Sequence, residues 1–132
     1  MLILFVCVEN AGRSQIAEAY AKKFGANAIS AGTLPALEIN PTVAATMKED
    51  GFDPSNLKPK VLTNEMIESA SVIVTMGCAI QDVCPTPLVK SMRKTVLEWH
   101  IEDPKHKPIE KVREIRDDIK NKVLDLLHQQ GA

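Results

Sequence analysis

The segment LILFVCVENAGRS, residues 2–14, determines how the rest of this chain folds. Its first part, residues 2–7, is apolar without alternation, which is typical of a strand buried inside a parallel sheet. Apolar residues at helical spacing then predict a helix over residues 14–24. A strand that turns tightly into a helix favours anion binding, because the loop N–H groups converge and the helix N-terminus adds partial positive charge. We therefore predict an oxyanion-binding loop between this strand and this helix.

Two side chains bring reactive chemistry to this loop. Cys7 stands at the end of the strand, where the local field favours its thiolate, the nucleophilic form. Arg13 carries a planar guanidinium that can bind two oxygens of a tetrahedral oxyanion. We expect the anion to be held by the Arg13 side chain and by the backbone N–H groups of a loop that comprises Cys7, Val8, Glu9, Asn10, Ala11, Gly12 and Arg13.

The neighbouring residues have supporting roles. Asn10 can bridge backbone groups and tolerates a left-handed backbone, and Gly12 permits backbone angles that other residues resist. Ser14 can donate its hydroxyl to the Cys7 sulfur and can also open the helix. The alternative is that Cys7 is only a buried thiol and Arg13 a surface residue. The C-x5-R-S spacing between a strand and a helix favours the catalytic interpretation.

Strands and helices alternate along the rest of the chain. Residues 52–62 contain two X-Pro pairs and predict a connection, and residues 77–93 predict irregular structure because two prolines block a helix. This alternation predicts an α/β fold, with a parallel sheet covered by helices on both faces in a single domain of residues 1–132. The other predicted strands are residues 27–33, 71–76 and 95–99, and the other predicted helices begin at Pro41 and end at Gly51, begin at Thr63 or Asn64 and run through Glu68, and span residues 109–128.

The composition excludes several classes of protein. The net charge of −1 gives no general attraction to nucleic acid or to a membrane surface. The N-terminal apolar run is too short for a signal peptide, and no apolar run could cross a membrane, so we expect a cytoplasmic protein, and we expect a monomer. The chain has 3 cysteines, and in a cytosolic protein this odd number indicates reactive or metal-binding thiols.

The segment Cys7–Ser14 resembles the phosphate-binding loop of low-molecular-weight protein tyrosine phosphatases and of the arsenate reductases that share their fold. The turn Ser30-Ala31-Gly32 matches a segment common in both, and the resemblance extends along the whole chain. It implies the strand order 2-1-3-4. In that order the end of the first strand is the topological switch point, where ligands bind in such sheets.

An Asp-Pro pair follows the fourth strand, at Asp103-Pro104. Asp-Pro is a common turn, so a purely structural role is one interpretation. The resemblance implies instead that Asp103 is the general acid that protonates the leaving oxygen. Tyrosine phosphatases of this fold usually continue with aromatic residues, whereas this chain continues with Lys105 to Pro108 and is only 4% aromatic. A small inorganic oxyanion therefore fits better than a phosphotyrosine ring.

Cys78 and Cys84 follow the third strand, and Pro85 comes next. They could be structural, or could form a zinc site with Cys7, although the C-x5-C spacing is unusual for zinc. The resemblance implies a thiol relay, in which Cys78 and then Cys84 carry a disulfide away from Cys7 for reduction by a thioredoxin- or glutaredoxin-like partner. In thioredoxin-coupled relatives the first relay cysteine stands where this chain has Gly77, which leaves the reductant open.

Geometry constrains such a relay. Six residues of regular helix separate two Cα atoms by about 9 Å, whereas a disulfide needs them within about 7 Å. We therefore expect residues 78–84 to rearrange when they become oxidised. The resemblance also implies a potassium ion near Asn10, Glu18 and Ser30, although Glu18 could be an ordinary polar helix residue, and we expect no tightly bound cofactor.

The sequence thus predicts an arsenate reductase that uses Cys7, Arg13, Ser14, Asp103, Cys78 and Cys84 as catalytic residues. The second candidate is a phosphatase that hydrolyses phosphomonoesters through a phosphocysteine, for which the two later cysteines would be dispensable. A third candidate is a non-catalytic redox sensor or oxyanion-binding module. Glu9 fits every enzymatic interpretation poorly, because it is an acidic residue in an anion-binding loop, and we expect its side chain to point out of the loop.

Overall fold

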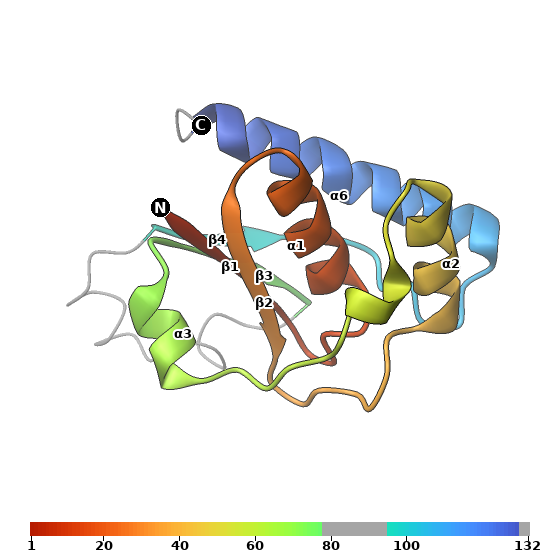
Figure 1. Cartoon of the computed structure of the whole chain (residues 1–132), viewed down its shortest axis with the longest axis horizontal. Coiled ribbons are helices and arrows are strands. Elements are labelled where there is room, and N and C mark those ends of the chain that lie inside the picture. The colour runs from red at the N-terminus through yellow and green to blue at the C-terminus, as the bar shows by residue number, and fades with distance from the viewer. Residues whose placement is uncertain (78–94, 130–132) are drawn as a thin grey trace.

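The computed structural model describes residues 1–77 and 95–129, which form a parallel sheet flanked by helices (Figure 1). The sheet has the order β2-β1-β3-β4, and all three strand pairs are parallel, so the predicted order is confirmed. The strands are β1 (Leu2–Cys7), β2 (Asn27–Gly32), β3 (Val72–Met76) and β4 (Thr95–Trp99). β1 and β3 are completely or almost completely buried, as their unbroken apolar sequences predict.

Helices cover both faces of the sheet, and the two layers differ in size. On one face, α1 (Arg13–Lys23), α2 (Pro41–Glu49) and α6 (Ile109–Gln129) enclose the larger core, which includes Phe5 of β1. On the other face, the short helix α3 (Asn64–Ser69) covers a smaller core around Leu4 and Val6. In Figure 1 the three helices of the large layer lie above the sheet and α3 lies below it.

Helix α1 is more deeply buried than its sequence pattern predicts. Residues Ser14 to Ala21 are all buried, because α1 packs against both the sheet and α6. The small alanines of α1 allow this close approach. The polar residues at the start of α1 are consequently inside the protein, where each polar atom needs a hydrogen-bond partner.

The predicted element boundaries agree with the structure to within about two residues, which is the usual uncertainty of helix and strand ends. One difference concerns the site. Helix α1 begins at Arg13 with Gly12 as its N-cap, and no side chain caps it, so Ser14 does not open the helix as predicted. Thr63 caps α3 through its hydroxyl, and Asn40 caps α2 through its side-chain oxygen. The connection over residues 52–62 contains one short helical turn, η1 (Pro54–Asn56).

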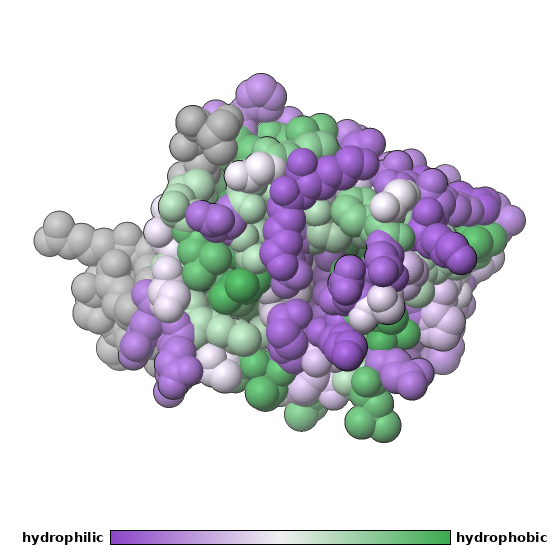
Figure 2. Space-filling view, in the orientation of Figure 1, coloured by the Kyte–Doolittle hydropathy of each residue, from purple (hydrophilic) through white to green (hydrophobic). Residues whose placement is uncertain are grey.

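Figure 2 shows a surface on which hydrophilic side chains alternate with smaller hydrophobic areas. Within residues 1–77 and 95–129, the large apolar side chains that are exposed are Met1, Leu34, Leu37 and Val61. In this part of the chain no helix combines the length and the apolar character that crossing a membrane would require.

Candidate active site

A cavity of about 250 Å³ opens at the carboxyl ends of β1 and β3. This is the edge of the sheet at which a doubly wound fold binds its ligands, and β1, with β2 on one side and β3 on the other, is the switch point. The lining comes from the end of β1 and the loop after it, the start of α1, the N-cap of α2, the residue after β3 and the loop after β4. These residues are Cys7, Val8, Glu9, Ala11, Gly12, Arg13, Asn40, Gly77, Asp103, Pro104 and Lys105.

The carbonyl groups of the loop after β1 point outward, toward residues 33–40. Backbone N–H groups of Thr33, Leu34, Ala36 and Asn40 donate to the carbonyl oxygens of Cys7, Val8, Glu9 and Ala11, at distances from 2.8 to 3.2 Å. A peptide whose carbonyl is held on one side presents its N–H on the opposite side. The loop N–H groups are therefore available to the cavity, as an oxyanion-binding loop requires.

Asn10 fixes the shape of the loop from inside. It is completely buried and has a left-handed backbone with φ +52°, as predicted for it. Its Oδ1 accepts hydrogen bonds from the backbone N–H of Lys60 at 2.8 Å and from Gln15 Nε2 at 3.0 Å. Since a backbone N–H can only donate, this contact sets the orientation of the amide and leaves Nδ2 as the donor to Ser14 Oγ at 2.7 Å.

The orientation of Asn10 determines where the proton of Ser14 points. Because Ser14 Oγ accepts from Asn10, its own proton is free to point to Cys7 Sγ, which lies 2.8 Å away. The backbone N–H of Asn10 also donates to Sγ, at 3.3 Å. Two donors thus converge on the sulfur of Cys7, a residue that is only 3% exposed. Such donors stabilise the thiolate form, which is the nucleophile.

Arg13 extends along the cavity wall, and its side chain is only 11% exposed. Its Nη1 donates to the carbonyl of Ile101 at 3.1 Å, which holds the guanidinium from behind. Gly77 lies against the same group: a Cβ at position 77 would be only 2.6 Å from Nη2, and φ there is +81°. Position 77 therefore has no space for a side chain while Arg13 keeps this position.

Gly12 is required for space as well as for its backbone angles. Its φ of −149° and ψ of −92° are neither helical nor extended, which agrees with the prediction that this position needs the freedom of glycine. A Cβ at position 12 would lie 2.9 Å from Cγ of Pro104. Pro104 thus packs directly over the loop after β1 and brings Asp103 to the cavity.

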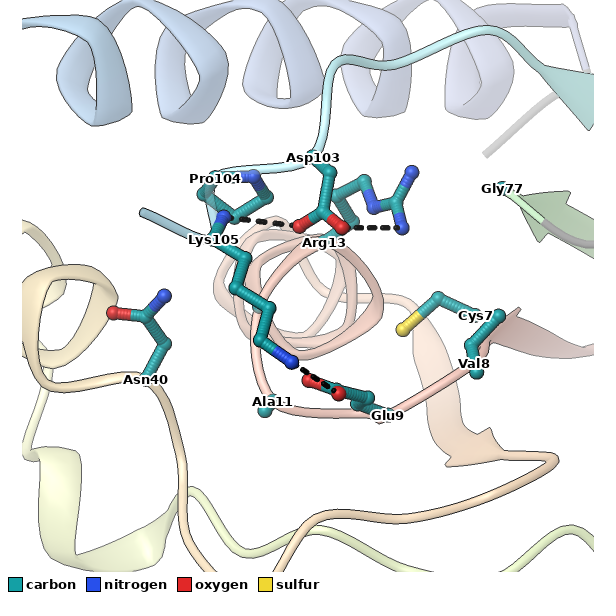
Figure 3. A pocket seen from close by; sticks show the side chains of 11 residues that line it. Cys7, Val8, Glu9, Ala11, Arg13, Asn40, Gly77, Asp103, Pro104 and Lys105 are labelled. Atoms are coloured by element: carbon teal, nitrogen blue, oxygen red, sulfur yellow. Dashed lines mark hydrogen bonds and ion pairs between the residues drawn. The ribbon is translucent and has the colours of Figure 1, made fainter. Parts of the chain in front are cut away.

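Asp103 lies across the cavity beside Arg13, with 3.7 Å between Oδ2 and Nη2 (Figure 3). Its side chain is 57% exposed, and its Oδ1 accepts from the backbone N–H of Lys105 at 3.0 Å. Figure 3 also shows Lys105 reaching across the cavity to Glu9, with 2.8 Å between Nζ and Oε1. Glu9, the residue that fitted poorly in an anion-binding loop, is therefore neutralised by Lys105.

The structure brings Asn10, Glu18 and Ser30 together, but as a hydrogen-bond chain. Asn10 turns its amide nitrogen, not its oxygen, toward Ser30 Oγ at 3.0 Å, and Ser30 donates to Glu18 at 2.9 Å. Ammonium groups of Lys22 and Lys60 lie 3.1 and 3.6 Å from the Glu18 carboxylate. Two cations already compensate this carboxylate, so these residues do not fit a potassium site.

Cys78 and Cys84 lie outside the described residues. β3, the strand that precedes them, does lie directly beside β1, as predicted, with Val6 opposite Thr75. The sequence did not reveal that residues 33–40 hold the loop carbonyls, that Lys60 orients Asn10, or that Lys105 pairs with Glu9. The sequence shows that Glu9 and Lys105 carry opposite charges, but nothing in it shows that the two residues meet.

Comparison with known proteins agrees with this geometry. The family described as "Low molecular weight phosphotyrosine protein phosphatase" matches residues 2–131. An arsenate reductase of Staphylococcus aureus (strain Newman) is 37% identical over 122 residues, which cover 89% of this chain and 89% of that protein.

Two solved structures are also similar. The Corynebacterium glutamicum thioredoxin-dependent arsenate reductase Cg_ArsC1' has a TM-score of 0.78 and 37% identity over 97% of this chain, and the match covers 60% of the other chain. The YwlE arginine phosphatase from Geobacillus stearothermophilus has a TM-score of 0.84 and 26% identity, covering 98% of this chain and 92% of the other.

Proposed function

Because the chain belongs to the low-molecular-weight phosphotyrosine protein phosphatase family, we propose that it is an arsenate reductase, which converts arsenate to arsenite. One observation carries the proposal: a thiol, an anion-binding loop and a carboxyl group line a single cavity of about 250 Å³. The guanidinium of Arg13 and the converging loop N–H groups suit a tetrahedral oxyanion. The arsenate reductase of Staphylococcus aureus is 37% identical and matches 89% of this chain and 89% of its own length.

The first step is nucleophilic attack by Cys7 on arsenic. Arg13 and the loop N–H groups bind the arsenate oxygens and stabilise the charge that develops on them. The Cys7 thiolate forms an S–As bond, and an As–O bond opposite to it breaks. Asp103 gives its proton to the departing hydroxide, which leaves as water. Arsenic remains in its pentavalent state, bound to Cys7.

The second step reduces arsenic at the expense of two thiols. The Cys78 thiolate attacks Cys7 Sγ, an S–S bond forms, and the electron pair of the S–As bond passes to arsenic. Arsenic becomes trivalent and leaves as arsenite. Cys84 then attacks Cys78, which releases the Cys7 thiolate and leaves a Cys78–Cys84 disulfide. An external dithiol protein reduces this disulfide by thiol–disulfide exchange.

The position of Gly77 supports the relay. Gly77 lines the cavity together with Cys7, so Cys78 is the residue directly after a cavity residue.

We also propose a cytoplasmic location, which would keep all three thiols reduced between turnovers. The external dithiol is thioredoxin-like or glutaredoxin-like, and a similar protein of Corynebacterium glutamicum is thioredoxin-dependent. We also propose that the protein acts as a monomer.

The phosphatase alternative rests on the same first half of the site and on the similarity to an arginine phosphatase. Against this alternative, Lys105 and not an aromatic residue follows Asp103-Pro104, so this position offers no aromatic ring against which an organic group could pack. The sensor alternative required Cys7 and Asp103 to be too far apart to share a ligand. Both residues line the same cavity, which favours an enzyme.

The test is arsenite formation by the wild-type protein and by the Cys78→Ser and Cys84→Ser variants, with a thioredoxin and a glutaredoxin system supplied separately. We expect both variants to lose multiple-turnover reduction and to keep their low phenyl phosphate hydrolysis. Cys84→Ser should still release one arsenite per protein and accumulate a Cys7–Cys78 disulfide, detectable by mass spectrometry after digestion. Brisk hydrolysis that is indifferent to both cysteines, with no arsenite from either reductant, would identify a phosphatase.

A further inference from the structure

An ion pair crosses the mouth of the oxyanion cavity. Glu9 comes from the loop after β1, and Lys105 comes from the loop after β4 that carries Asp103. Their charged atoms lie 2.8 Å apart, and both residues line the cavity (Figure 3). Their side chains are 41% and 51% exposed, so the pair stands at the boundary between cavity and solvent.

The direction of attack decides which substrate group must pass this mouth. The Cys7 sulfur approaches arsenic or phosphorus from the floor of the loop, and the leaving oxygen departs roughly in line, on the opposite side. That side is where Asp103 lies, as its role as acid requires. In arsenate the leaving oxygen carries only hydrogen. In a phosphomonoester it carries an organic group, which must extend past Asp103 into the space that Lys105 and Glu9 cross.

We propose that the Glu9–Lys105 pair is a specificity determinant that admits free inorganic oxyanions and excludes phosphomonoesters. The inference rests on the proposed function, because it specifies the substrate class of the same cavity. The pair also explains the acidic residue in the anion-binding loop. Hydrogen bonding to Glu9 raises the pKa of Lys105, so the pair keeps its charge and Glu9 does not repel the oxyanion through an uncompensated charge.

The experiment measures a ratio of rates, because a ratio cancels the general effect of charge on anion binding. The value of kcat/KM is measured for arsenate and for phenyl phosphate in Glu9→Gln, Lys105→Met, the double variant and the charge exchange E9K/K105E. Lys107→Met is the matched control, since Lys107 lies on the same loop and pairs with Glu102 at 3.7 Å without lining the cavity.

We expect the single and double variants to shift the ratio toward phenyl phosphate by about 10-fold or more, the size of effect that steric discrimination in a pocket gives. The charge exchange should return the ratio to within about twofold of wild type, and the control should leave it unchanged within the same margin. A ratio that stays at the wild-type value in all variants overturns the proposal. So does an equal loss of both rates, which would show that the pair only holds the Asp103 loop in place.

Failure of the proposed function has a different signature. If the wild-type protein forms no arsenite, arsenate is used as a competitive inhibitor of phenyl phosphate hydrolysis, and its inhibition constant replaces kcat/KM in the ratio. The specificity proposal then stands if Lys105→Met weakens the preference for arsenate over phenyl phosphate and the charge exchange restores it. It falls if neither variant changes that preference.

Discussion

The two loops that meet over the cavity are held in place by different means. The loop after β1 is fixed by backbone hydrogen bonds to residues 33–40 and by the buried side chain of Asn10. The loop after β4 is anchored by the buried residues Ile101 and Pro104, but the side chains that it extends over the cavity are held by ion pairs. Of these side chains, Asp103 and Lys105 are 57% and 51% exposed. Glu102 adds ion pairs at 3.7 Å to Lys107 and 3.3 Å to Lys111.

This difference separates binding from proton transfer. Buried hydrogen bonds are strong and cannot be exchanged for water, so the anion-binding loop is preorganised for the charge of the transition state. Exposed ion pairs contribute about 0 to 1 kcal/mol each and exchange readily with solvent. The charged side chains of the acid loop, which is the loop after β4 that carries Asp103, can therefore reorient as substrate enters and water leaves, while the loop after β1 keeps its shape.

The largest expected effect is a loss of activity that leaves the stability of the protein unchanged. Asp103→Asn removes the proton donor, and we expect kcat for arsenite formation to fall about 10²- to 10⁴-fold. The thermal midpoint should change little, because Asp103 is mainly exposed. The measurement is steady-state kinetics beside thermal unfolding. A large loss of stability would show that the acid loop is as rigidly built as the other loop.

The next effect is on stability and activity together. Asn10→Ala removes the four hydrogen bonds of its side chain to Ser14, Gln15, Ser30 and Lys60. Each has an average net value of about 1 kcal/mol, so we expect a loss of about 4 kcal/mol in the free energy of unfolding. Urea denaturation measures it. Asn40→Ala is the control, since it removes a helix cap worth about 1 kcal/mol. Equal losses in the two variants would contradict the special role of Asn10.

A smaller effect is expected at Gly77, which lies against the guanidinium of Arg13. Gly77→Ala places a Cβ against the Arg13 guanidinium at a position with φ +81°. We expect Arg13 to shift and kcat/KM for arsenate to fall about 10- to 100-fold, the cost of a mispositioned binding group. Gly25→Ala is the matched control: its φ is +91°, and no atom lies within 4 Å of the added Cβ. A similar fall in both variants would show that backbone strain, and not Arg13, is responsible.

The smallest effect is expected at the exposed ion pairs of the acid loop. Glu102→Gln removes the partner of Lys107 and Lys111, whose side chains are about two-fifths exposed. We expect less than about 1 kcal/mol of change in the free energy of unfolding and little change in kcat. The free energy of unfolding of wild type, Glu102→Gln and Asn10→Ala is measured at low salt and at 1 M salt. If salt changed the stability of neither wild type nor Glu102→Gln, these ion pairs would not be what holds the charged side chains of the acid loop.

The amino-acid sequence alone was sufficient for the fold, for the strand order through its family resemblance, and for the identity of Cys7, Arg13 and Asp103 as candidates. These features rest on local patterns: apolar runs, a C-x5-R-S spacing and an Asp-Pro pair. The assignment of Ser14 as the residue that opens α1 was wrong, because the helix begins one residue earlier with Gly12 as its cap. The relay roles of Cys78 and Cys84 stay predictions.

Contacts between distant positions could be obtained only from the folded chain. Asn10 meets Lys60 across 50 positions, and Glu9 meets Lys105 across 96. Local patterns carry no information on such pairs, because the order of the strands and the paths of the loops decide which distant residues lie close together. The sequence therefore determined which chemical groups this protein has and in which local elements they lie. The tertiary structure decided which groups touch, and so which carbonyls turn away from the anion, where the Ser14 proton points and which ion pair crosses the mouth of the cavity.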